Sequence, residues 1–394
     1  MSDRNLSSAM DRRRGSGPAT GVAADVASAL VVVSAAALAL GCAPAPAAAQ
    51  APDSPAPDSQ APDSPDVSTV DITYAVGADL SFLKAAEDRG VEFRDVDGTV
   101  RPGLDLFRDH GYDWIRLRLF HTPDRLPNDL EYTIELAREA KARGFRFLLD
   151  YHYSDTWADP QHQVTPAAWD TTDIDVLVDS VYAYTRSTIA AFREAGVMPD
   201  MVQIGNEVRN GMIWPLGRLP DHWDHFARLF KAGLDGIDAG RGQAPRPLIM
   251  LHYDNGADTE GTKAFLDRFH GYRIPYDVIG LSYYPWWHGT LVGLRDNILS
   301  ILEHYPDRDV IVVEVGYRPH EYDDGELAPF PDDAPGGPRK AFLEAVNETL
   351  LGISSRRVKG IFWWEPASGC GRDYFDDDCR ALPVMTVFDR FKRH

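Results

Sequence analysis

Two glutamates follow apolar runs that are typical of buried strands. Glu207 comes shortly after the run 201–204 and directly after Asn206, and Glu314 directly follows the aliphatic run 310–313. Two carboxyl groups that flank a glycosidic bond can cleave it, one by attacking the anomeric carbon and the other by protonating the leaving oxygen. A separation of about 5 to 5.5 Å retains the sugar's configuration, whereas a wider gap admits a water and inverts it. The sequence predicts the pair but not the distance.

Other polar side chains near predicted strand ends could assist these two carboxyls. Asn206 suits the 2-hydroxyl of the sugar at the cleavage point, where a hydrogen bond can strengthen in the transition state. Arg116 or Arg118 could keep Glu314 ionised, because a fixed guanidinium lowers the pKa of a neighbouring carboxyl. We expect Tyr284 to donate its hydroxyl to Glu314; the alternative is a tyrosine that only packs.

The remaining candidates would contact the sugar itself. Trp364 is expected to lie under a sugar ring, with Trp363 pointing the other way because neighbouring residues of a strand face opposite sides. The side chains of His152, Asp79 and Asp155 could bind sugar hydroxyls or only orient their neighbours. Four loop tryptophans could line outer sugar subsites or pack within their loops: Trp157, Trp214, Trp286 and Trp287.

Short apolar runs alternate with longer segments of helical period, which is the pattern of βα units. The expected strands are 74–80, 114–120, 145–151, 201–206, 248–252, 278–284, 310–314 and 360–365, and the expected helices are 130–143, 173–195, 222–239, 259–269, 291–304 and 338–351. Eight such units close into a (β/α)₈ TIM barrel, whose chemistry lies at the C-terminal ends of the strands. An open doubly wound sheet is the alternative, but no Gly-x-Gly-x-x-Gly or Walker-type loop supports it.

Five stretches carry a resemblance to a known family. They are GVEFRDVDG (90–98), DYHYSDTWADPQHQ (150–163), QIGNEVRNGMIWPLG (203–217), GLSYYPWWHGTL (280–291) and GIFWWEPA (360–367). Together they resemble glycoside hydrolase family 53, the arabinogalactan endo-β-1,4-galactanases, from about residue 74 to the C-terminus. The resemblance implies a (β/α)₈ retaining glycosidase with Glu207 as acid/base and Glu314 as nucleophile. It also favours Arg116 over Arg118, and internal cleavage of pectic β-1,4-galactan without a required cofactor.

Two other readings stay open at this point. A related barrel enzyme could cut another β-1,4-glycan, such as mannan or cellulose. A surface lipoprotein that binds glycans without cleaving them would belong to a different class, and the presence of both glutamates argues against it.

The first 66 residues are expected to lie outside the fold. Three arginines, 12–14, precede the mainly apolar run 29–40, which is typical of a secretory signal in residues 1–49. Processing could occur at Cys42, giving a lipid-anchored protein, or after the alanines 47–49, giving free secretion. Residues 50–66 repeat Ala-Pro-Asp-Ser and predict an extended linker to a single catalytic domain over 67–394.

Charge and cysteine content further limit the possible binding partners and metal sites. Forty basic residues against 60 acidic ones give a net charge of −20, which would repel nucleic acid. Cys370 and Cys379 are expected to pair in an exported protein. No zinc-binding pattern occurs, and a structural calcium is uncertain: the two candidate loops are the segment 322–326 and the acidic group of Asp373, Asp376, Asp377 and Asp378.

Overall fold

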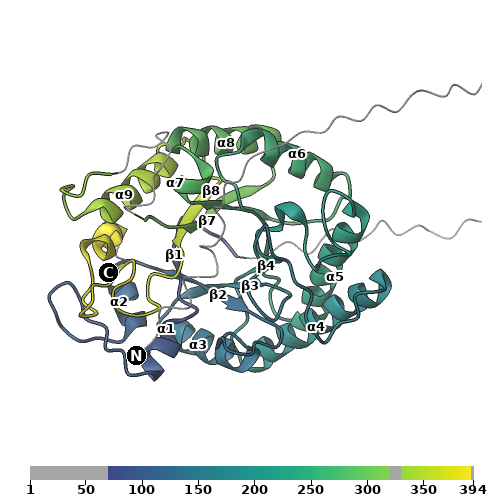
Figure 1. Ribbon diagram of the computed structural model, residues 1–394, viewed down its shortest axis with the longest axis horizontal. Coiled ribbons are helices and arrows are strands. Elements are labelled where there is room, and N and C mark those ends of the chain that lie inside the picture. The colour runs from purple at the N-terminus through teal and green to yellow at the C-terminus, as the bar shows by residue number, and fades with distance from the viewer. Residues whose placement is uncertain (1–69, 319–329, 392–394) are drawn as a thin grey trace, which may run out of the picture. The chain divides into compact units, whose positions relative to one another are not determined.

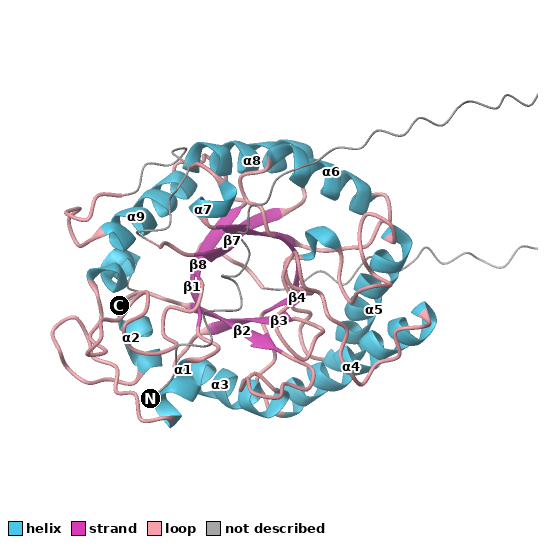
Figure 2. Cartoon of the chain, in the orientation of Figure 1, coloured by secondary structure: helices cyan, strands magenta, loops and turns pink. Residues whose placement is uncertain are grey.

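The computed structural model describes residues 70–318 and 330–391. These residues form a closed barrel of parallel strands, in which each strand pairs with the next in sequence and the last pairs with the first. Figure 1 shows the strands as an inner ring and the helices as an outer ring around them, and Figure 2 separates the two layers by colour. The predicted (β/α)₈ TIM barrel is confirmed, and the open sheet is excluded.

Each of the eight predicted apolar runs overlaps one strand of the barrel. The strands are β1 (Ala75–Asp79), β2 (Trp114–Leu119), β3 (Arg146–Tyr151), β4 (Met201–Ile204), β5 (Leu248–Tyr253), β6 (Val278–Tyr283), β7 (Asp309–Val315) and β8 (Val358–Trp363).

The longer helices form where the helical period predicted them, and several begin at a side chain that caps the first turn. Asp129, Asp173 and Asp258 each accept a hydrogen bond from a backbone N–H in the turn that follows. The helices are α1 (Leu83–Asp88), α2 (Gly103–Asp109), α3 (Leu130–Ala142), α4 (Ile174–Glu194), α5 (Trp223–Arg241), α6 (Thr259–His270), α7 (Pro285–His288), α8 (Leu291–His304) and α9 (Pro338–Leu351), with 3₁₀ helices η1 (Val208–Asn210) and η2 (Pro383–Phe391). Sequence analysis did not predict α1, α2 and α7, because helices of one or two turns carry little periodic signal.

The wall of the barrel has two different faces. Side chains that point outward pack under the helices in one large apolar cluster, which includes Ile115, Leu149 and Val312. Side chains that point inward near the strand N-termini, including Trp114, Leu148 and Val313, fill the interior with a second apolar cluster. Farther along the same strands the inward positions become polar. The barrel therefore has a packed apolar base and a polar mouth, which is the usual arrangement of this architecture.

A register shift between β6 and β7 changes which residues face the interior. Leu281 pairs with Val312, but the next residue, Ser282, pairs with Glu314, so Val313 is an extra residue on β7. Val313 belongs to the inner cluster, and regular alternation would turn Glu314 outward. A bulge of this kind redirects the following side chain, and here it brings Glu314 to the mouth.

The predicted pairing of Cys370 with Cys379 is confirmed. Backbone hydrogen bonds join the segment beside this disulfide to the loop between α1 and α2. The Arg94 N–H donates to the Cys379 carbonyl, and the Ala381 N–H donates to the Arg94 carbonyl, each at 2.8 Å. Within the described ranges, no helix has both the length and the apolar character needed to cross a membrane. Cys42, the predicted signal and linker, and the loop 322–326 lie outside the described residues.

Candidate active site

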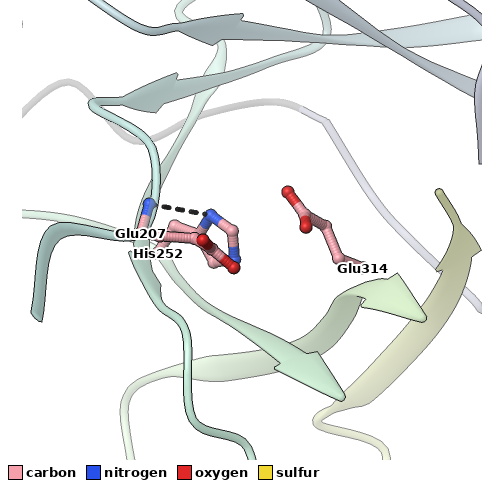
Figure 3. Close-up of side chains that lie close together, drawn as sticks. All are labelled: Glu207, His252 and Glu314. Carbon is pink, nitrogen blue, oxygen red and sulfur yellow. Dashed lines mark hydrogen bonds between the residues drawn. The ribbon is translucent and has the colours of Figure 1, made fainter. Parts of the chain in front are cut away.

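Glu207 and Glu314 meet at the mouth of the barrel. One carboxyl oxygen of each glutamate and one ring nitrogen of His252 all lie within 4.8 Å of one another. Figure 3 shows Glu314 across from Glu207 and His252, on a different strand. This separation matches the spacing of a retaining carboxyl pair and is too short for the about 6.5 to 9.5 Å gap of an inverting pair.

Glu207 is held in an unusual backbone conformation just after β4. Its φ of 48° and ψ of 55° are left-handed, and Gly205 two residues earlier also has a positive φ of 78°. A residue other than glycine adopts this region only where its surroundings enforce it, and such residues cluster at functional sites. The turn directs the Glu207 carboxyl toward β6, where the Ser282 hydroxyl lies 2.7 Å from Oε1.

Both oxygens of Glu314 have a donor. Arg116 Nη1 lies 2.8 Å from Oε1, and the Tyr284 hydroxyl donates to Oε2 at 2.8 Å. Arg116 is fully buried and Glu314 is nearly so. The structure therefore places Tyr284 and Arg116 where the sequence analysis expected groups that favour the ionised form of Glu314.

The two glutamates differ in their affinity for a proton. Burial raises the pKa of Glu207 well above its usual value, and the charge of Glu314 raises it further. Burial also raises the pKa of Glu314, but the Arg116 guanidinium and the Tyr284 hydroxyl oppose that shift. These contacts favour the proton on Glu207 and the negative charge on Glu314, which is the division that an acid and a nucleophile need.

Arg116 is the centre of a buried polar network. Its Nη2 donates to Asn206 Oδ1 at 2.8 Å and lies 2.8 Å from Asp150 Oδ2. Asn206 Nδ2 donates to the Ala158 carbonyl at 2.8 Å, which uses one of its two amide hydrogens. The network fixes Asn206 next to Glu207 and leaves an amide hydrogen for a ligand.

Three of the predicted contact residues have other partners. Asp79 is fully buried, with Oδ1 accepting from Ser81 and Oδ2 between the two arginines, 3.0 Å from Arg116 and 3.1 Å from Arg118. His152 Nδ1 accepts from the Ala158 N–H at 2.8 Å, and Nε2 lies 3.0 Å from Asp150. For these two buried side chains, the contacts correspond to the orienting alternative.

Asp155 lies between loops rather than at the carboxyl pair. Its Oδ1 accepts from the Thr122 N–H at 3.0 Å and its Oδ2 from the Ala167 N–H at 2.8 Å. In the described ranges, no hydrogen bond or ion pair joins Asp155 to Glu207 or Glu314. The observed contacts make it a brace between the loops that follow β2 and β3.

The two tryptophans at the C-terminal end of β8 point in opposite directions, as alternation predicts. Trp363 is buried among Phe342 and Tyr374 in the outer layer. Trp364 is partly exposed on the side of the mouth, and its ring lies 6.0 Å from that of Trp157.

The four loop tryptophans differ in the groups that surround them. Trp157 lies over the Arg118 guanidinium at 4.4 Å, and Trp286 packs against Tyr284 with ring centres 5.3 Å apart. Trp287 is 55% exposed, whereas the Trp214 indole N–H donates to the Asn210 carbonyl at 2.9 Å. Trp214 is thus anchored in its own loop, and the other three remain near aromatic or charged groups of the mouth.

Sequence reasoning placed three residues of the site near strand ends but assigned them no role. Glu365 is buried in a left-handed conformation with φ of 46° and contacts Arg118, and burial raises its pKa to about 8. His252 and Ser282 lie beside Glu207. The signal for all three was their position at strand ends, but many polar residues share that position and only the tertiary contacts distinguish them.

In the described ranges, only one group of three or more potential metal-ligating side chains has its ligand atoms close together. The group is Glu207, His252 and Glu314. Both ring nitrogens of His252 already have hydrogen-bond partners, Asn206 and Ser282. In the acidic loop, Asp376 accepts from the backbone N–H groups of Asp378 and Arg380. The two His252 nitrogens and Asp376 Oδ1 are therefore already engaged in hydrogen bonds within the protein.

Comparison with known proteins agrees with this geometry. The family model described as glycosyl hydrolase family 53 matches residues 75–388. A probable arabinogalactan endo-β-1,4-galactanase A of Aspergillus terreus is 37% identical over 80% of this chain and 95% of its own. The arabinogalactan endo-β-1,4-galactanase A of Aspergillus niger is 36% identical over 82% of this chain and 97% of its own. A solved structure from a study of two fungal β-1,4-galactanases superposes with a TM-score of 0.74 and 31% identity, covering 81% of this chain and 100% of that one. The chain belongs to glycosyl hydrolase family 53.

Proposed function

We propose that this glycoside hydrolase is a retaining endo-β-1,4-galactanase, which cleaves internal β-1,4-galactosidic bonds of pectic galactan. The observation that carries the proposal is that one carboxyl oxygen of Glu207 lies within 4.8 Å of one carboxyl oxygen of Glu314. The galactanase relatives support galactan as the polysaccharide substrate. The reaction needs two carboxyl groups and water, and no cofactor.

The first step forms a covalent glycosyl-enzyme. A carboxylate oxygen of Glu314 attacks the anomeric carbon, the bond to the leaving oxygen breaks, and Glu207 gives its proton to that oxygen. Arg116 and Tyr284 hold the attacking carboxylate in place. Asn206 directs its remaining amide hydrogen to the 2-hydroxyl of the sugar.

The second step releases the sugar. Glu207, now ionised, takes a proton from a water that attacks the anomeric carbon, and the bond to Glu314 breaks. Two displacements restore the original configuration. Trp364, which is partly exposed at the mouth, packs its indole against the ring of a bound sugar.

A substrate screen tests this function. Purified enzyme is incubated with galactan, mannan, cellulose and xylan, and the products are sized. We expect rapid shortening of galactan to a mixture of oligosaccharides. Preferential cleavage of mannan or cellulose would show that the enzyme acts on that glycan instead. Slow release of monosaccharide alone would reject internal cleavage. Binding without cleavage would show that the protein is not a hydrolase.

We also propose that the protein is exported, with residues 1–49 as signal, 50–66 as linker and 67–394 as catalytic domain. The arginines before an apolar run and the Cys370–Cys379 disulfide support export. Mass spectrometry of the mature protein distinguishes its two forms. A lipid on Cys42 marks a cell-surface lipoprotein, whereas an N-terminus just after Ala49 marks free secretion.

A further inference from the structure

We propose that a pocket on the Glu207 side of the mouth binds a uronate, the carboxylate-bearing sugar of the pectic main chain to which galactan side chains are attached. The pocket has a volume of about 400 Å³ and is lined by residues of η1, the end of β5 and helices α5 and α6. This volume is within the range of about 300 to 1,000 Å³ that is typical of ligand sites. The inference rests on the proposed galactanase function and adds a site for the acidic part of the same substrate.

The pocket is basic although the protein is acidic. Arg209 and Arg268 line it, and no aspartate or glutamate of the described residues does. The whole chain, in contrast, has 60 acidic against 40 basic residues. Two lining cations favour an anionic ligand, and the planar guanidinium of arginine can donate two parallel hydrogen bonds to a carboxylate.

Both arginines have N–H groups for such a ligand. Arg268, on α6, is exposed and makes no ion pair within residues 70–318 and 330–391. Arg209 Nε lies 3.0 Å from Oδ1 of Asp254, which is buried. A guanidinium has five N–H donors, and one carboxylate uses only part of them. Asp254 therefore holds Arg209 in place and cancels part of its charge, whereas no ion pair offsets the charge of Arg268.

An aromatic side chain completes the pocket. Trp223 is partly exposed, and its ring packs against those of Phe265 and Phe226, with ring centres 5.4 and 5.9 Å apart. These contacts fix the indole, which lines the pocket together with Phe265. An indole offers a flat apolar surface that suits a sugar ring. The combination of two arginines with an indole favours an acidic sugar over a small inorganic anion.

The pocket adjoins the proposed acid/base. Arg209 follows Glu207 by two residues, in η1. Asp254 directly follows β5, and its charge acts on Glu207 as well, raising the pKa of that carboxyl. Trp364, the expected sugar platform, follows β8, and Figure 1 shows β8 and β4 on opposite sides of the inner ring. A polysaccharide that crosses the mouth from Trp364 over the two glutamates therefore continues toward the pocket.

The role of Glu207 sets the direction of that polysaccharide. Glu207 protonates the leaving oxygen, so the part of the chain on the reducing side of the cut lies on the Glu207 side of the mouth. A glycan branch is joined to its main chain through its reducing end. The pocket therefore lies toward the end of a galactan side chain that leads to the uronates of the pectic main chain.

Titration with a disaccharide of α-1,4-linked galacturonate, followed by NMR, tests the pocket directly. We expect the disaccharide to bind the wild type and to bind Arg268→Gln about fivefold more weakly, which is near the upper limit for one exposed charge pair. Its methyl ester keeps the sugar rings but has no charge, so it should bind the wild type at least about fivefold more weakly than the acid. Added salt should weaken binding of the acid and not of the ester.

Arg138→Gln is the matched control. Arg138 is also an exposed arginine without an ion pair in the described part of the chain, and it lies on α3, across the barrel from α6 in Figure 1. Its substitution should leave the affinity for the disaccharide unchanged. No binding of the acid, equal affinity for the acid and the ester, or an equal effect of the two substitutions would overturn the proposal.

Kinetics on two substrates connect the pocket to catalysis. The first substrate is galactan still attached to its uronate main chain, and the second is neutral galactan released from it. Arg268→Gln should lower the ratio of kcat/KM for the first to kcat/KM for the second by about fivefold, whereas Arg138→Gln should not change this ratio. An unchanged ratio in Arg268→Gln would contradict a pocket on the path of the substrate. If the wild type cleaves neither substrate, the proposed function fails, and the titration still decides whether the pocket binds a uronate.

Discussion

Arg116 Nη1 lies 2.8 Å from Glu314 Oε1, although Arg116 lies on β2 and Glu314 lies on β7. The guanidinium is fully buried and cannot lose its proton, so it favours a negative charge on Glu314 at every working pH. Glu207 instead faces the carboxyl groups of Asp254 and Asp159, whose charges raise its pKa. This asymmetry assigns the two carboxyls different chemistry and gives the first prediction.

Glu207→Gln and Glu314→Gln should fail differently. Loss of the general acid should reduce kcat/KM on galactan by about 10²- to 10⁴-fold, but attack on an aryl substrate with a very good leaving group should persist because that group needs no proton. Glu314→Gln should lose both activities because the nucleophile is absent. Initial rates on the two substrates make the comparison, and equal behaviour of the variants would refute the assigned roles.

Tyr284→Phe should move the acid limb of the pH profile. The Tyr284 hydroxyl donates to Glu314 and lowers its pKa, so without it the pKa rises. Because Glu314 must be ionised, activity should then be lost at a higher pH as the solution is acidified, by about one pH unit. Tyr151→Phe removes a buried hydroxyl bonded to Thr188 and is the control. A limb that stays in place would show that the contact does not tune Glu314.

Trp364→Ala should weaken substrate binding more than chemistry. The indole is partly exposed at the mouth, where it offers a flat face to a sugar ring. We expect KM for galactan to rise about fivefold with a smaller change in kcat, since stacking of this kind contributes about 1 kcal/mol. Trp287→Ala, at a residue that is 55% exposed, tests whether any exposed indole has this effect. The same KM for Trp364→Ala and the wild type would exclude the platform.

Removing the disulfide should lower stability while leaving the site formed. The Cys370–Cys379 bond closes a short loop, with a sequence separation of 9, which corresponds to about 2 to 3 kcal/mol of chain entropy. Thermal unfolding of Cys370→Ser/Cys379→Ser should therefore occur several degrees lower, with kcat near that of the wild type at moderate temperature. A large loss of kcat without a change in Tm would mean that the loop acts on catalysis directly.

The sequence by itself determined the barrel and its principal residues. Alternation of apolar runs with helical segments located every strand, because strand and helix periods are local properties of the chain. Several boundaries shifted by one or two residues; the predicted helix 173–195, for example, begins one residue later, because Asp173 caps α4 from just outside it. Glu207 and Glu314 were identifiable because each follows an apolar run, and Trp363 and Trp364 because neighbours on a strand face opposite sides.

Only the tertiary structure decided how these residues act. The extra residue Val313 turns Glu314 inward, and a bulge depends on pairing with another strand rather than on local sequence. Asp79 and Asp155 are polar residues at strand ends like the others, yet their carboxyls are used by arginines and loop backbone. The hydrogen bonds from Glu207 to Ser282 and from Ser282 to His252 join the turn after β4 to β6 and β5, so they exist only once these elements have come together in the barrel.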